Sequence, residues 1–162
     1  MLESIAVLMG SIVLVALTAL TGGIFRPDGW YRALAKPSWT PPDKVFPIAW
    51  AVLYLLMAIA AWRVFMADES TARTAGLVLY LLQLVFNAAW SWLFFGRRRI
   101  VAGLVDILLL WMVLSLTILL FAQTSALAAW LLVPYWFWIA FAALLNARIW
   151  KLNPFESSPR NA

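Results

Sequence analysis

One polar stretch interrupts the apolar first half of this chain: Gly29-Trp30-Tyr31-Arg32-Ala33-Leu34-Ala35-Lys36-Pro37-Ser38-Trp39-Thr40-Pro41-Pro42, continuing through Phe46-Pro47 to Trp50. Each proline restricts its own φ angle and biases the residue before it toward extended backbone. The stretch also holds large aromatic rings, which flexible or disordered linkers lack. It therefore predicts an ordered loop over 26–46 that lies as a lid across the mouth of a helical bundle. Long ordered loops of this kind are usually functional.

The composition of the whole chain is that of an integral membrane protein. Of its 162 residues, 65% are apolar and 12% are charged, whereas about 25% of an average soluble domain is charged. The chain contains no cysteine and no histidine, which excludes a disulfide framework and removes the commonest metal ligand and general base. We therefore expect no metal site and no required cofactor.

The net charge of +5 does not indicate nucleic acid as a partner. The basic residues stand at the ends of apolar segments, where membrane topology requires them, and no nucleic-acid motif occurs. The lipid bilayer is the expected partner instead.

Five apolar segments are long enough to cross a bilayer, which takes roughly 20 residues in a helix. Their apolar residues do not alternate with polar ones, so helices are expected rather than the strands of a β-barrel. The first segment is too long for a signal peptide and follows Glu3 rather than a basic residue, so it is expected to remain as a span. The predicted fold class is an all-α integral membrane protein, a single domain over 1–162. It is a bundle of five transmembrane helices with an ordered loop lid between the first two, and the spans are expected at about 4–25, 47–66, 75–95, 100–121 and 126–148.

The distribution of Lys and Arg predicts the orientation of the bundle. The lid loop, the turn at 97–99 and the segment 148–160 together hold ten of the twelve basic residues, and the opposite side holds Arg63 and Arg73. Because basic loops stay in the cytoplasm, we expect the N-terminus outside and both the lid and the C-terminus inside. Helical hydropathy favours a bacterial cell membrane, with the outer membrane as the alternative.

Polar residues fall on one face of the third span. Five of its residues are spaced as one helical stripe: Gln83, Asn87, Trp90, Ser91 and Phe94. An amide inside hydrocarbon has to find a partner, so Gln83, Asn87 and Asn146 are expected to point inward.

Asp106 is the one acidic residue inside a span. An acid in a membrane is by default a functional candidate. The arginines at 97–99 and Arg148 lie on the same side of the membrane, however, so a structural ion pair is the favoured interpretation.

Several blocks of sequence resemble the signature of the tryptophan-rich sensory protein and translocator protein family (TspO/MBR). The first is Trp30-Tyr31-x-x-Leu34-x-Lys36-Pro37-x-Trp39-x-Pro41-Pro42, followed by Trp50-x-x-x-Tyr54. The later blocks are Gln83-Leu84-x-x-Asn87-x-x-Trp90-x-x-x-Phe94-Phe95 and Pro134-Tyr135-x-x-Trp138-x-x-x-Ala142-x-x-x-Asn146. The resemblance covers nearly the whole chain and implies a five-helix bundle, often a homodimer. It also implies a cavity for porphyrins such as protoporphyrin IX and haem, for sterols and for benzodiazepine-type ligands.

The resemblance also implies which residues line the ligand site. By their positions in the motifs they are Trp39, Trp50, Tyr54, Asn87, Trp90, Ser91, Trp138 and Ala142. Aromatic faces and a few hydrogen-bonding groups suit a flat apolar macrocycle that carries carboxylates. The alternatives are that tryptophans only form the headgroup belt and that Asn87 and Ser91 only join helices. Arg32, Lys36 and Lys44 in the lid either pair with ligand carboxylates or reflect the positive-inside bias alone.

The leading expectation is a membrane receptor or carrier that binds a porphyrin-type ligand beneath the lid, with a sensing or transport role. A light-dependent porphyrin-degrading enzyme is a second reading, for which the resemblance implies Trp30 and Trp138; no other catalytic residue is expected. A small-solute transporter is the third. Without His or Cys, haem would lack its usual axial ligands, which favours metal-free porphyrin. Sterol binding is in doubt because 144–151 lacks the tyrosine of the animal members' sterol pattern.

Small residues at helical spacing allow a dimer. Ala19-x-x-x-Gly23 and Ala72-x-x-x-Gly76 have the small-xxx-small spacing that lets helices approach closely. A homodimer is therefore expected.

Overall fold

Five long helices make up most of the computed structural model, which describes residues 1–154. They are α1 (Leu2–Ile24), α3 (Val45–Phe65), α4 (Thr71–Ser91), α5 (Ile100–Thr124) and α6 (Ala126–Leu152). Each is long and apolar enough to cross a membrane, with α4 counted together with the turn that follows it. The predicted all-α membrane bundle is confirmed, and the last helix continues beyond the expected end at 148.

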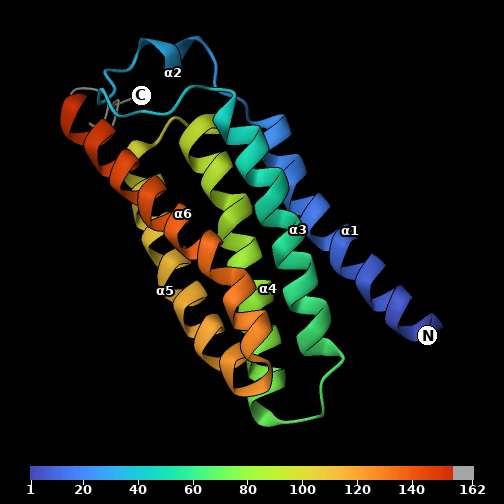
Figure 1. Ribbon diagram of the computed structural model, residues 1–162. Coiled ribbons are helices and arrows are strands. Elements are labelled where there is room, and N and C mark those ends of the chain that lie inside the picture. The colour runs from blue at the N-terminus through green and yellow to red at the C-terminus, as the bar shows by residue number, and fades with distance from the viewer. Residues whose placement is uncertain (155–162) are drawn as a thin grey trace.

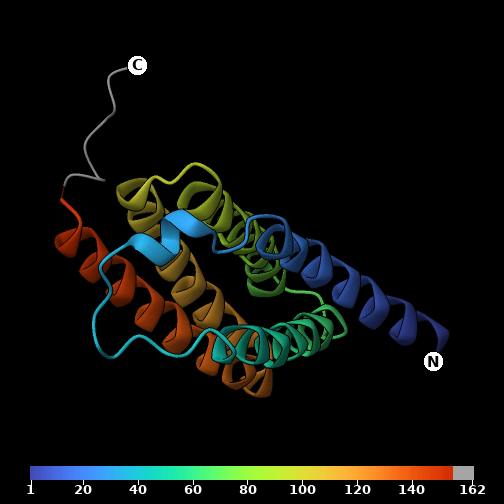
Figure 2. The same cartoon turned by 90° about the horizontal axis from the view of Figure 1, so that it is seen from above.

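The helices form a closed bundle when seen from above (Figure 2). α5 packs between α4 and α6, α3 packs against α6, and α1 packs against α3 and α4. The centre is filled by large side chains with almost no exposed surface, among them Met57, Tyr80, Phe121 and Tyr135. α1 is the least buried helix, because only Ser11, Val15 and Thr18 lose nearly all their surface.

The lid between α1 and α3 lies across one end of the bundle (Figure 1). It spans residues 25–44 and contains a short helix, α2 (Gly29–Ala33), that the sequence did not predict. Asp28 caps α2 by accepting a hydrogen bond from the Tyr31 backbone N–H at 3.1 Å. Tyr31 and Leu34 are buried in a cluster whose other buried members are Phe94, Ile100, Leu145 and Ile149. The prediction of an ordered lid is confirmed.

Polar contacts fasten the lid to the helix ends around it. The Asn153 amide donates to the Ala35 carbonyl at 2.9 Å and accepts from the Ala35 N–H at 3.0 Å. Arg98, in the turn between α4 and α5, pairs with Asp28 at 2.7 Å. The lid, this turn and the end of α6 therefore meet at one end of the bundle, as the distribution of basic residues predicted.

A π-helical turn, η1 (Trp92–Gly96), follows α4 and leads into the lid contacts. The Arg97 N–H donates to the Trp92 carbonyl at 2.7 Å, which is the wider spacing of a π-helix. A Cβ atom on Gly96 would stand 2.7 Å from Cδ1 of Phe25. Glycine is therefore required where the end of α1 crosses this turn.

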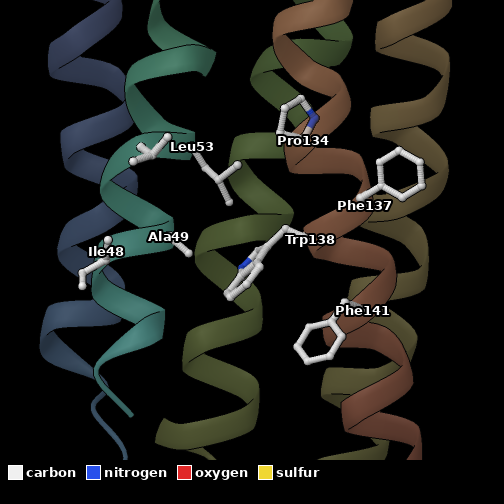
Figure 3. A pocket seen from close by; sticks show the side chains of 8 residues that line it. Ile48, Ala49, Leu53, Pro134, Phe137, Trp138 and Phe141 are labelled. Atoms are coloured by element: carbon white, nitrogen blue, oxygen red, sulfur yellow. The ribbon is translucent and has the colours of Figure 1, made fainter. Parts of the chain in front are cut away.

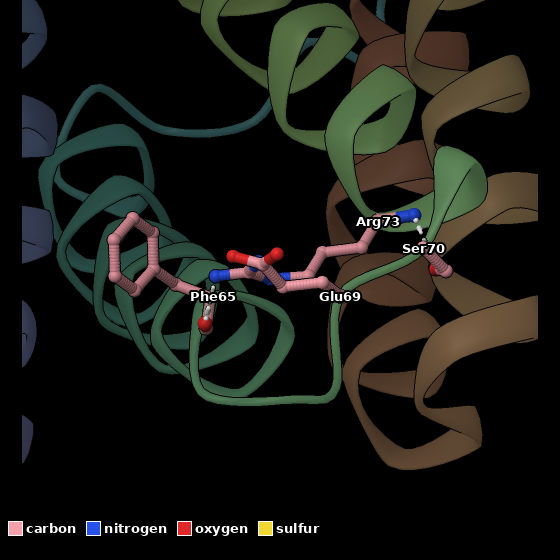
Figure 4. Close-up of polar contacts among 4 residues, drawn as sticks. All are labelled: Phe65, Glu69, Ser70 and Arg73. Atoms are coloured by element: carbon pink, nitrogen blue, oxygen red, sulfur yellow. Dashed lines mark hydrogen bonds and ion pairs between the residues drawn. The ribbon is translucent and has the colours of Figure 1, made fainter.

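The opposite end of the bundle has short turns. Between α3 and α4, Arg73 donates to the Phe65 carbonyl at 2.6 Å and pairs with Glu69 at 3.5 Å (Figure 4). Ser70 caps α4 by accepting from the Arg73 N–H. One arginine therefore holds this turn, whereas the lid depends on contacts from several helices.

Candidate functional site

Four polar side chains from three helices form a connected network inside the bundle. The Tyr54 hydroxyl donates to Oδ1 of Asn87 at 2.9 Å, and Nδ2 of Asn87 donates to the Tyr135 hydroxyl at 2.7 Å. The Tyr135 hydroxyl in turn donates to Oε1 of Gln83 at 3.0 Å. Polar groups in hydrocarbon are costly unless paired, so this polar network (Tyr54, Gln83, Asn87 and Tyr135) has a clear physical cause. The predicted inward orientation of Gln83 and Asn87 is confirmed.

Three aromatic rings, those of Trp50, Tyr54 and Trp138, form an aromatic wall between α3 and α6. Tyr54 belongs both to this wall and to the polar network. Trp50 stacks on Tyr54 with ring centroids 5.2 Å apart, and its edge meets Trp138 at 6.4 Å. On its other sides Trp138 contacts Phe46 and Phe141, each at 5.8 Å. Trp50, Tyr54 and Trp138 are all half-buried. The aromatic wall therefore lies between the buried polar network and the surface of the bundle.

A side groove of about 450 Å³ opens between α3 and α6, and Trp138 of the aromatic wall is one of the residues that line it (Figure 3). Its lining is entirely apolar: Ile48, Ala49, Val52, Leu53, Pro134, Phe137, Trp138 and Phe141. Ile48 and Phe137 are 68% and 62% exposed, so the groove opens on a surface that faces lipid. Its volume is within the range of about 300–1,000 Å³ that is usual for ligand pockets.

Trp90 belongs to a second polar contact nearer the lid. Its indole N–H donates to Oδ1 of Asn146 at 3.2 Å, and Nδ2 of Asn146 donates to the Ile100 carbonyl at 3.0 Å. The Trp90 ring stacks on Phe94 with centroids 5.1 Å apart. Asn146 is buried, as predicted, and it ties α6 to the start of α5.

The remaining predicted site residues lie apart from the aromatic wall. Trp39 is 48% exposed on the lid, and its ring meets that of Phe141 edge to face with centroids 5.6 Å apart. Ser91 faces α1, because a Cβ atom on Gly22 would stand 3.9 Å from its hydroxyl oxygen. Ala142 is half-buried and packs against the central core. The structure thus brings Trp50, Tyr54, Asn87 and Trp138 together and distributes the other four around them.

Comparison with known proteins accounts for this combination of tryptophans, lid and helices. A sequence profile described as the TspO/MBR family matches residues 11–151. The chain belongs to the TspO/MBR family. Protein CrtK of Rhodobacter capsulatus is 41% identical over 145 residues, which cover 89% of this chain and 91% of the relative. Tryptophan-rich protein TspO of Chlorobaculum tepidum is 45% identical over 131 residues, covering 80% and 83%. Translocator protein of Bos taurus is 38% identical over 133 residues, covering 81% and 79%.

Membership of the TspO/MBR family, together with the five spans, defines a multi-pass integral membrane protein of the TspO sensory or binding type. In this TspO/MBR protein the two halves of the Trp–Pro motif build different structures. The part up to Pro42 belongs to the lid, and Trp50 and Tyr54 in α3 belong to the aromatic wall.

Trp30 and Trp138, the pair that the resemblance implies for porphyrin chemistry, lie in different clusters. Trp30 meets the edge of Phe94 at 6.0 Å beneath the lid. Trp138 contacts the rings of Phe46, Trp50 and Phe141.

Lys36 has a structural role in the lid. Its ammonium group donates to the carbonyls of Tyr31 at 2.7 Å and Leu34 at 3.0 Å, at the end of α2. It also lies 4.6 Å from the centroid of the Tyr31 ring. Arg32 and Lys44 are exposed lid cations, and Arg26 is exposed too but donates from Nε to the Gly23 carbonyl at 2.6 Å.

The predicted ion pair of Asp106 is wrong. Asp106 is buried, and its Oδ2 atom has no hydrogen-bond partner among residues 1–154. Within residues 1–154 the ion pairs are Arg73–Glu69 and Arg98–Asp28. Arg98 lies beyond the helix end, where the lid supplies a nearer carboxylate. Asp106 is six residues inside α5, or ~9 Å along the axis.

The lid carboxylate Asp28 has a pKa that its neighbours shift. The Tyr31 backbone N–H and the Arg98 guanidinium hold the pKa of the Asp28 carboxyl below its usual value. Burial raises the pKa of the Tyr31 hydroxyl, and the charge of Asp43 raises it further. Asp28 therefore stays ionised and keeps both its cap and its ion pair.

Three residues of this region were not among the expected ligand-site residues, although Pro134 and Tyr135 stand in the matched motif. Tyr135 connects two members of the polar network, Phe141 contacts Trp138, and Pro134 lines the side groove. A periodic signal was available, because these positions lie three or four residues from Trp138 and hence on one face of α6.

Proposed function

We propose that this protein is a membrane receptor or carrier that binds a porphyrin-type ligand at the aromatic wall. The observation that carries the proposal is the position of the wall, between an apolar groove and a buried network of hydroxyl and amide groups. A flat apolar macrocycle stacks on rings, and its polar edge requires hydrogen-bonding partners. Binding has to separate Trp50 from Trp138, because these rings now touch.

The carboxylates of such a ligand would pair with the exposed lid cations Arg32 and Lys44. Lys36 is a weaker candidate, since it is held by backbone carbonyls. The chain has no histidine or cysteine, so a metal-free porphyrin fits better than haem, which relies on such axial ligands.

The orientation and the assembly complete the proposal. The lid, the 97–99 turn and the C-terminal end would face the cytoplasm of a bacterium, with the N-terminus outside the cell membrane. A homodimer would use α1 rather than α4. A Cβ on Gly76 would stand 3.1 Å from Phe121, whereas a Cβ on Gly23 would have no neighbouring atom from residues 1–154 within 4 Å.

Titration of the purified protein in detergent with protoporphyrin IX, followed by tryptophan fluorescence, tests the binding proposal. We expect saturable quenching in the dark that is weakened by Trp138→Phe and by Asn87→Ala. Trp130→Phe is the matched control, because Trp130 is 71% exposed and lines neither the side groove nor the aromatic wall. Linear quenching, or quenching indifferent to both site variants, would show partition into the micelle and contradict the proposal.

Illumination of the same samples separates a receptor from an enzyme. A receptor should leave the porphyrin spectrum equal to that of a protein-free micelle control. A new absorbing product that forms at a rate dependent on Trp138 would replace the receptor by a light-dependent porphyrin-degrading enzyme.

A further inference from the structure

The lid end of the bundle is closed to a large ligand. Tyr31 and Leu34 are 8% and 6% exposed and packed into the cluster beneath the lid. Asn153 and the Asp28–Arg98 pair bind the lid to α6 and to the turn after η1. A ligand that entered beneath the lid would have to break all these contacts at once.

The side groove lacks such fastenings. Its rim, with Ile48, Val52 and Phe137, is 53–68% exposed, and its lining is apolar throughout. A molecule dissolved in the bilayer can therefore enter the groove without stripping water from any polar group. The groove ends at Trp138, which lines it and on its inner side meets Trp50.

Trp138 is held by apolar contacts, with the rings of Phe46, Trp50 and Phe141 and with the central core. Within residues 1–154 its indole N–H makes no hydrogen bond, whereas those of Trp62, Trp90 and Trp136 each have an acceptor. Pro134 lies one turn earlier in α6. Proline has no N–H to donate to the preceding turn of the helix, and such a site is where helices bend.

We infer that the side groove is the entrance through which a planar apolar ligand passes from the bilayer to the aromatic wall. The Trp138 ring turns aside to admit it. This inference rests on the proposed ligand binding and specifies its route: the ligand arrives from lipid and not from water beneath the lid. The exposed apolar rim, continuous with the aromatic wall through Trp138, is what selects this occupant.

Kinetics distinguish an entrance from a binding contact. Because Kd is the ratio of the dissociation and association rates, a plug in an entrance slows both rates and changes Kd less than either. A lost binding contact acts mainly on dissociation instead.

The experiment uses the full chain in phosphatidylcholine nanodiscs, with protoporphyrin IX delivered from donor vesicles and tryptophan quenching followed by stopped flow. Val52→Trp places a bulky ring on the rim, and Ala49→Leu fills the groove more conservatively if the first variant folds poorly. Val105→Trp is the control, because Val105 is 54% exposed on α5 and does not line the groove. We expect Val52→Trp to slow association and dissociation together by about tenfold, Ala49→Leu to slow both less, and Val105→Trp to match the wild type.

Three outcomes would contradict the inference that the side groove is the ligand entrance. Wild-type rates in both groove variants, with faster rates in Asn153→Ala, would place the route beneath the lid. Faster dissociation with unchanged association in Val52→Trp would make the rim a binding contact only. A changed oligomeric state in both groove variants would make the groove an interface between two copies. Absence of saturable binding by the wild type would be a different failure, that of the proposed function itself.

Discussion

Two helix contacts, α4–α5 and α3–α6, differ in how closely the helices approach each other. On the first, glycine lets the helices come close: a Cβ on Gly76 would stand 3.1 Å from Phe121, and beside this contact a Cβ on Gly103 of α5 would stand 3.2 Å from Phe94 in η1, the turn that continues α4. On the second, large rings stand between the helices and leave a groove of about 450 Å³. Helices in lipid associate through close packing and not through a hydrophobic driving force. The α4–α5 contact is therefore the rigid support, and the α3–α6 contact is where the bundle can admit a ligand.

The largest expected effect comes from disturbing the close contact. Gly76→Leu must displace Phe121, which is fully buried and stacked on Tyr80 at 5.9 Å, so we expect a loss of about 1–3 kcal/mol in the free energy of unfolding. Gly10→Leu is the matched control, because nothing lies within 4 Å of a Cβ there and the gain in helix propensity is the same. Unfolding in detergent by titration with sodium dodecyl sulfate measures both variants. Equal free energies of unfolding for Gly76→Leu and Gly10→Leu would contradict the inference that the α4–α5 contact is rigid.

A smaller loss in the free energy of unfolding is expected in the polar network, which joins α3 and α6 to α4. Asn87→Leu removes the partner of both Tyr54 and Tyr135, and interhelical hydrogen bonds in membranes average about 0.6 kcal/mol with a maximum near 1.7. We expect a loss of about 1 kcal/mol by the same unfolding assay. Tyr54→Phe breaks one of the two bonds and should cost less. A Tyr54→Phe loss equal to that of Asn87→Leu would mean that the bond to Tyr135 contributes nothing.

A local effect is expected at the lid. Asn153→Ala removes both hydrogen bonds to Ala35, each of which contributes about 0.5–1.5 kcal/mol. Amide hydrogen exchange should accelerate in the lid more than in the long helices, because the lost bonds hold the lid locally. Asn153→Asp keeps an acceptor for the Ala35 N–H, so its exchange rate in the lid should lie between those of the wild type and Asn153→Ala. Unchanged exchange at Ala35 in the alanine variant would show that the aromatic cluster holds the lid without Asn153.

The smallest effect is expected from pH. The folded-state pKa of Asp28 is lowered from 3.8, so its contribution is fully present above that value and is lost as the pH falls through the folded pKa. The NMR resonance of the Tyr31 amide, which donates to Asp28, should titrate with a midpoint below 3.8. Arg98→Gln should raise that midpoint, since the guanidinium lowers the pKa. A midpoint unaffected by Arg98→Gln would mean that the ion pair does not form in solution.

Part of the candidate site could be predicted from the sequence. Buried amides in lipid must pair, so Gln83, Asn87 and Asn146 had to face inward, and each does. Trp90 shares a helical stripe with Asn87, yet it pairs with Asn146 instead of joining the polar network. One helix face meets two neighbours at different heights, and periodicity does not say which neighbour a residue on that face will reach.

The five helices and the lid follow from the amino-acid sequence alone. A chain in hydrocarbon has to satisfy its backbone hydrogen bonds within each segment, so long apolar runs become helices whatever packs beside them. Three features depend on how the helices pack: Asp28 pairs with Arg98, Oδ2 of Asp106 has no hydrogen-bond partner among residues 1–154, and the groove opens between α3 and α6. Each of these depends on distances between groups remote in the chain, and such distances are fixed by helix packing rather than by local sequence.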